Sequence, residues 1–178
     1  MRKSSKTALG GIITAASVAL MFILSVFPYL TYALPAAAGA LLIFITIEID
    51  KKWAFGVFAA TGILSVILVP DKEAAILYIA FFGYYPIIKS YIESKFKSRV
   101  FEYFVKLMIF NFTVTVSYFL MIRFMGITLD TSESFGRFAV PVLLIMGNVT
   151  FFAYDFALTR IISVYLHKWQ RHFRKIFK

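Results

Sequence analysis

The residues of this sequence that could do chemistry are polar side chains set inside long apolar segments. Asn111, Thr115 and Tyr118 would share one face of a helix, and Asn148 and Asp155 would share a face of another. A polar group is costly in an apolar medium, so each one indicates either a contact between helices or a site. Counting about 1.5 Å per residue from the flanking loops places Asn111 and Asn148 at a similar depth. The two amides are therefore expected either to bond each other or to line a substrate cavity.

Asp155 would lie closer to the end of its segment than Asn148 does. A lone buried carboxylate must either take up a proton or find a cationic partner. Lys89 and Lys106 are expected at a similar depth, and Arg160 is a third possible partner. The sequence favours an ion pair over a proton relay, with Asp155 and Lys106 as structural polar residues.

An aromatic face precedes Lys89, because Tyr78, Phe82 and Tyr85 recur at helical spacing. Pro86 has no N–H group, so it leaves the carbonyl of Phe82 without its helical partner and predicts a kink. The face belongs either to the core or to the wall of a cavity for a flat or apolar ligand. The candidate substrate-binding residues are Tyr78, Tyr85, Asn111, Thr115, Tyr118 and Asn148.

Small residues form a second pattern, because Gly11, Ala15 and Ala19 repeat every four residues near the N-terminus. Such a stripe lets two helix backbones approach closely. It either packs against the chain's own helices or docks a helix of a partner protein.

Groups for catalysis or metal binding are scarce. The chain has no cysteine, and its two histidines, His167 and His172, both lie near the C-terminus. This excludes thiolate chemistry and a buried histidine base or metal ligand. We therefore expect no enzymatic activity, no metal site and no cofactor.

Composition shows which elements must position these residues. The chain has 178 residues, of which 61% are hydrophobic and 16% charged, and this excludes a soluble globular enzyme and a disordered chain. Six segments are long and apolar enough to cross a bilayer. They cover about 8–27, 32–49, 53–69, 74–91, 101–125 and 138–166. The short loops predict one transmembrane domain over 1–178, an all-α bundle of six helices.

The net charge of +10 predicts how this bundle is oriented. With the N-terminus inside, all but three of the nineteen lysines and arginines lie on or near the cytoplasmic side; the exceptions are Lys72, Arg123 and Arg137. The positive-inside rule then places both termini in the cytoplasm, at a bacterial-type cell membrane. Residues 167–178 are expected to form a basic amphipathic tail that binds anionic lipid rather than nucleic acid.

The stretch from Ala8 to Leu20, with its small residues Ala15 and Ala19, resembles the first helix of S components of energy-coupling factor (ECF) transporters. S components are substrate-binding membrane subunits, and the resemblance covers essentially the whole chain. It implies that Gly11, Ala15 and Ala19 contact a transmembrane coupling subunit, which two cytoplasmic ATPases energise. It also implies that a vitamin or similar small molecule binds between the fourth to sixth spans, near the connector 27–32.

Two other functions remain open. The alternative is a non-enzymatic scaffold of the rod-shape-determining (MreD-like) kind, which binds other membrane proteins. A lipid-handling or signalling membrane protein is a third possibility. A binding subunit predicts a closed pocket among the fourth to sixth spans, whereas a scaffold predicts a collapsed cavity there and a partner groove elsewhere.

Overall fold

The computed structural model describes residues 3–23, 28–30, 32–96, 98–125 and 136–170, and these residues form helices and connections but no strand. The elements are α1 (Lys3–Ile23), η1 (Pro28–Leu30), α2 (Ala33–Ala40), α3 (Leu42–Glu48), α4 (Lys51–Leu68), α5 (Lys72–Leu77), η2 (Tyr78–Phe82), α6 (Tyr85–Lys95), α7 (Arg99–Met125), α8 (Gly136–Val164) and η3 (Tyr165–Trp169). The expected all-α class is therefore confirmed at this level.

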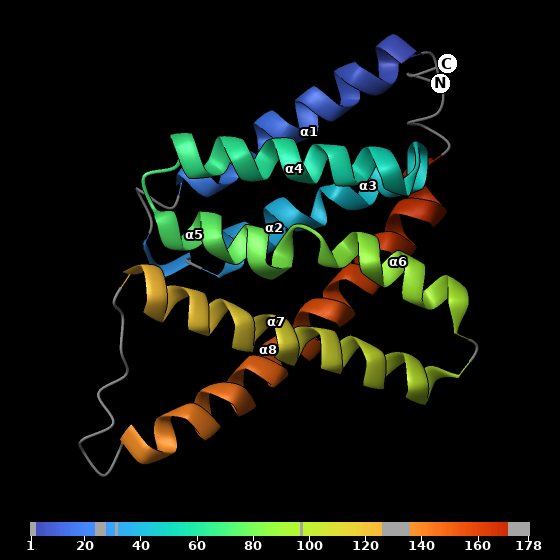
Figure 1. Cartoon of the computed structure of the whole chain (residues 1–178). Coiled ribbons are helices and arrows are strands. Elements are labelled where there is room, and N and C mark those ends of the chain that lie inside the picture. The colour runs from blue at the N-terminus through green and yellow to red at the C-terminus, as the bar shows by residue number, and fades with distance from the viewer. Residues whose placement is uncertain (1–2, 24–27, 31, 97, 126–135, 171–178) are drawn as a thin grey trace.

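The helices run back and forth across one bundle (Figure 1). α1 packs against α4 and α2, the α2–α3 segment lies between α4 and the α5–α6 segment, and α7 and α8 cross on the far side. The N-terminal end of α1 and the C-terminal end of α8 lie on the same side of the bundle. Of the expected tail, 167–170 continues the last helix, and 171–178 lies outside the described residues.

Within the described residues, five helices are long and apolar enough to cross a membrane. They are Lys3–Ile23, Lys51–Leu68, Lys72–Lys95, Arg99–Ser117 and Leu144–Lys168. Asp50 caps the N-terminus of the second of these helices, Lys51–Leu68, because its carboxylate accepts a hydrogen bond from the amide of Trp53 at 2.8 Å. Asp71 caps the next one by accepting from the amides of Glu73 and Ala74. The chain therefore has the helices of an integral membrane protein.

The fourth expected span is interrupted at its middle. η2 is a π-helical turn, closed by a 2.8 Å hydrogen bond from the amide of Gly83 to the carbonyl of Tyr78. Pro86 follows at the start of α6, so the carbonyl of Phe82 lacks its helical donor. The hydroxyl of Tyr154 on α8 lies 3.3 Å from this oxygen and 3.3 Å from the carbonyl oxygen of Ala36, so its one O–H is shared between the two carbonyls. The interruption expected from Pro86 is present, and another helix satisfies the freed carbonyl.

The second expected span, 32–49, forms two short helices instead of one. α2 ends at Ala40 and α3 begins at Leu42, and together Ala33–Glu48 make a shorter apolar helix than the five candidates. Gly39 lies against η2 so closely that a Cβ there would be 2.1 Å from the carbonyl oxygen of Phe82. The break in this span is thus packed against the break in the fourth span.

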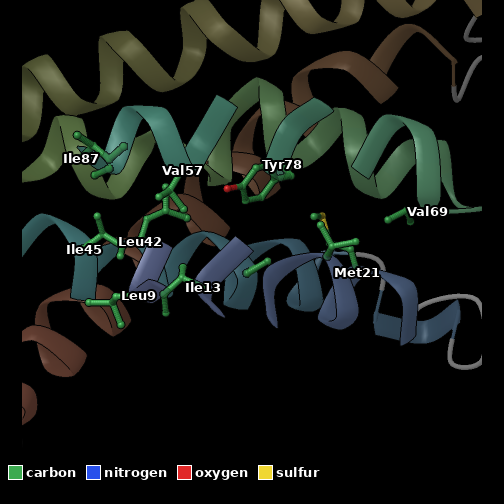
Figure 2. Close-up of a cluster of buried hydrophobic side chains, with 12 residues drawn as sticks. Leu9, Ile13, Met21, Leu42, Ile45, Val57, Val69, Tyr78 and Ile87 are labelled. Atoms are coloured by element: carbon green, nitrogen blue, oxygen red, sulfur yellow. The ribbon is translucent and has the colours of Figure 1, made fainter. Parts of the chain in front are cut away.

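Two buried clusters hold the bundle together. Figure 2 shows the first, in which Leu9, Ile13 and Met21 of α1 meet side chains of α3, α4, η2 and α6. The second joins η2 and α6 to α7 and α8 through aromatic side chains. Its main members are Phe81, Phe82, Tyr85, Phe110, Phe151 and Tyr154.

The close approach at Gly39 gives a stability prediction. Gly39→Ala should lower the free energy of unfolding by about 1–3 kcal/mol, because the new Cβ forces α2 away from η2. Thermal unfolding of the purified protein measures the effect. Gly56→Ala is the control, since a Cβ there meets nothing within 4 Å. Equal melting temperatures for the two variants would contradict the close contact.

Candidate functional site

Asp155 lies in a group of charges that joins α6, α7 and α8, in which Asp155, Lys89 and Lys106 are buried and Glu93 reaches the surface. We call this group the ionic cluster; it consists of Lys89, Glu93, Glu102, Lys106 and Asp155. Asp155 Oδ1 lies 2.6 Å from Lys89 Nζ and 3.4 Å from Lys106 Nζ. The ion pair expected for Asp155 and Lys106 is therefore present, and Lys89 makes the shorter contact.

Both ammonium groups of the ionic cluster have three acceptors around them. Lys89 Nζ contacts Asp155 at 2.6 Å, Glu93 at 2.7 Å and the hydroxyl of Thr159 at 2.9 Å. Lys106 Nζ contacts Glu93 at 2.8 Å and Glu102 at 2.5 Å, besides Asp155. Two of these contacts at each lysine are hydrogen bonds and the third is an ion pair, so the protein itself surrounds both ammonium groups with acceptors. This favours a clamp between helices over a group that hands protons on.

Tyr85 connects the ionic cluster to the second buried cluster, which is the aromatic one. Its hydroxyl donates to Asp155 Oδ1 at 2.6 Å, and its ring lies 4.7 Å from that of Phe81 and 5.4 Å from that of Phe151. Tyr85 is fully buried in these contacts. The aromatic face expected on the fourth span therefore lies in the core.

Tyr78, the other tyrosine proposed to bind substrate, is also fully buried. Its hydroxyl and that of Thr61 on α4 are neighbours and both are buried, but neither makes a hydrogen bond of good geometry with the described residues. Among the candidate substrate residues, Tyr78 thus keeps an unused polar group in the described part of the interior.

The two intramembrane amides bond each other. Asn111 Nδ2 donates to Asn148 Oδ1 at 3.0 Å, and Asn148 Nδ2 donates to Asn111 Oδ1 at 3.3 Å. Each Nδ2 also donates to a carbonyl of its own helix, from Leu107 or Leu144. Of the two interpretations of this pair, the structure agrees with a contact between helices.

The remaining candidates are not brought to this pair. Thr115 is exposed on α7, and its hydroxyl donates to the carbonyl of Asn111. The side chain of Tyr118 lies outside the described residues. Arg160, the third possible partner of Asp155, lies instead over the ring of Phe156, 4.9 Å from its centroid.

The small-residue stripe of α1 faces outward and lines a groove between α1 and α4. The groove has a volume of about 1180 Å³ and is lined by Gly11, Ala15 and Ala19 from α1 and by Gly56 and Ala60 from α4. Cβ atoms built at Gly11 and Gly56 would meet nothing within 4 Å, so the groove is open along both helices. Among the described residues, the stripe is thus left exposed by the chain's own helices.

Sequence reasoning missed two carboxylates of the ionic cluster and one wall of the groove. Glu93 was expected in a polar loop, but α6 continues to Lys95 and places Glu93 one turn after Lys89. The signal was the spacing of opposite charges four residues apart, which also pairs Glu102 with Lys106. The four-residue spacing of Gly56 and Ala60 gave the same kind of signal for α4.

Among the described residues, no group of three or more histidines, cysteines or carboxylates could hold a metal ion. No protein-family model matches the chain, and comparisons with curated proteins and with solved structures give no significant match. The groove and the buried polar groups are therefore the features of the molecule that bear on its function.

The two lysines of the ionic cluster give a testable pair of variants. Asp155→Leu should destabilise the protein by about 3–5 kcal/mol, because it leaves buried ammonium groups short of acceptors. Adding Lys89→Met should recover part of this loss, since Glu93 and Glu102 then suffice for Lys106. Thermal unfolding of the single and double variants measures the coupling, with Lys168→Met, at an exposed position, as control. Strictly additive losses would exclude a clamp.

Proposed function

We propose that the chain is the substrate-binding membrane subunit of an ECF-type uptake transporter, energised by separate ATPase subunits. In this proposal the six apolar segments span the cell membrane, with both termini in the cytoplasm. The subunit binds a vitamin or similar small molecule and passes it inward with the help of a coupling subunit. It has no enzymatic activity of its own.

The open groove between α1 and α4 is the observation that carries this proposal. The stripe of Gly11, Ala15 and Ala19, which resembles the docking stripe of S components, is exposed and not used for internal packing. Small residues on two neighbouring helices let a third helix come close to both backbones. The groove therefore suits a transmembrane coupling subunit.

Charge supports the proposed orientation. The helix ends on one side of the bundle in Figure 1 carry Lys3, Lys51, Lys52, Lys95 and Arg99. By the positive-inside rule this side faces the cytoplasm. The opposite end of α4 and the start of α5 carry Lys72 between Asp71 and Glu73, which leaves a net negative charge there.

A scaffold of the MreD-like kind is the second candidate, and the packing of the interior favours it. The side-chain polar groups of Tyr85, Asn111 and Asn148 are hydrogen-bonded to other groups of the protein. A scaffold needs a groove for partner proteins but no substrate pocket. One observation favours a binding subunit instead. The hydroxyls of Tyr78 and Thr61 are buried and make no hydrogen bond with the described residues.

Mass spectrometry of the gently purified protein separates the two candidates. A binding subunit should carry a small molecule at close to one per chain, and Tyr78→Phe should weaken its retention by removing the unused hydroxyl. Thr150→Val is the control, because its hydroxyl is exposed and bonded to its own helix. Repeated absence of any small molecule would reject the transport function and leave the scaffold.

Docking is tested by filling the groove. Ala15→Leu should prevent purification of the tagged protein together with its membrane partner, because a leucine occupies the space between α1 and α4. Ala157→Leu, on an exposed face of α8, should leave the complex intact. The amount of partner recovered is compared after blue-native electrophoresis. Survival of the complex in Ala15→Leu would show that docking occurs elsewhere.

A further inference from the structure

Thr14 is a buried polar residue in the wall of the groove whose hydroxyl has no hydrogen-bond partner in the described part of the chain. It is 8% exposed, lines the groove from α1, and makes no hydrogen bond with the described residues. The other hydroxyls described on this part of α1 are satisfied, since Thr7 donates to the carbonyl of Lys3 and Ser17 to that of Ala38.

Threonines inside helices commonly donate to the carbonyl four residues earlier. Thr46, Thr115, Thr150 and Thr159 all do so in this protein. Thr14 departs from this habit, so its hydroxyl remains free to donate into the groove. In an apolar surrounding, an unmade hydrogen bond is costly, which indicates that the occupant of the groove supplies an acceptor.

On both α1 and α4, the small residues that line the groove belong to a row of positions spaced by four residues. Each row begins with a lysine near the N-terminal end of its helix. On α1 the four-residue row runs from Lys3 through Thr7 to Gly11, and on α4 it runs from Lys52 to Gly56 and Ala60. Lys3 and Lys52 are both exposed and form no ion pair with the described residues. The lining of the groove begins at Thr7 and Trp53, so these two lysines lie just beyond one end of it, while its length is apolar apart from Thr7, Thr14 and the N–H group of Trp53.

We infer that the groove binds a transmembrane helix that has a small-residue face, an acceptor opposite Thr14 and a carboxylate at the end beside Lys3 and Lys52. This deepens the proposed docking function and rests on it. The small residues bring the partner's backbone carbonyls within reach of the Thr14 hydroxyl, and the two lysines attract the acidic end. The partner is thus defined by three separate features along one line.

A lipid chain fits the groove less well than a helix does. An acyl chain fills apolar space, but it offers no acceptor at the depth of Thr14, which lies between the rows and away from either end of α1. An anionic headgroup satisfies only the two lysines. A helix satisfies the hydroxyl, the apolar walls and the lysines at once.

The experiment uses a designed transmembrane peptide, a Leu/Ala helix with glycine at every fourth position and Glu at one end, and a matched peptide with Gln there. Binding to the full chain is measured by energy transfer in phosphatidylcholine vesicles. Because the chain has no cysteine, Ser163→Cys on the exposed surface of α8 takes the only thiol label.

The Glu peptide should bind about twofold to fivefold more tightly than the Gln peptide, and the double variant Lys3→Gln/Lys52→Gln should abolish this difference. Thr14→Val should weaken both peptides about threefold, because it removes one hydrogen bond between helices. Thr7→Val, in the same groove, and Lys168→Gln, outside it, should change nothing.

Equal binding of the two peptides, or full binding by Thr14→Val, would overturn this inference. Lysines that serve lipid headgroups would give that equality, together with a loss of affinity for phosphatidylglycerol vesicles in the double variant. Failure of the transport function is recognised separately. A chain that discriminates the peptides as expected but never carries a small molecule supports helix docking and rejects transport.

Discussion

The cost of placing charge in a low-dielectric interior constrains the packing of α6, α7 and α8. Asp155 is 2% exposed, and Lys89 and Lys106 are exposed by no more than 1%. Removing such groups from water is tolerated only when each has its full set of close partners. The three helices must therefore meet at one depth and in one register, since a shift by one turn would strip the lysines of their acceptors.

The aromatic layer next to the ionic cluster follows from the same register. Tyr85, Phe110 and Phe151 each lie four residues from a charged member of the cluster, on α6, α7 and α8 respectively. The rings of Phe110 and Phe151 stack with centroids 4.9 Å apart, and Phe151 meets Tyr85 edge to face at 5.4 Å, so the three rings close the charged layer from one side. Farther along, Tyr154 bridges to the carbonyl freed by Pro86. The interruption of the fourth span is thus stabilised by the helix that also supplies Asp155.

Depth along a helix can be counted from sequence, and contacts that depend on depth alone were predictable. The pairing of Asn111 with Asn148, and of Asp155 with Lys89 and Lys106, follows from such counting. Contacts that depend on which helices are neighbours were not predictable from the sequence. The break at Leu41 and the shared groove of α1 and α4 arise from tertiary packing, which a single sequence without homologues does not encode in its periodicity.

The contrast between the two sides of the bundle bears on function. Around Asp155 the described ammonium, amide and phenol groups are bonded within the chain, so this half gains rigidity and leaves little for a ligand. The α1–α4 face has the opposite character, because Gly11 and Gly56 meet open space and Thr14 makes no hydrogen bond with the described residues. The described residues thus combine a half whose polar groups are bonded to one another with an α1–α4 face that keeps open space and an unused donor.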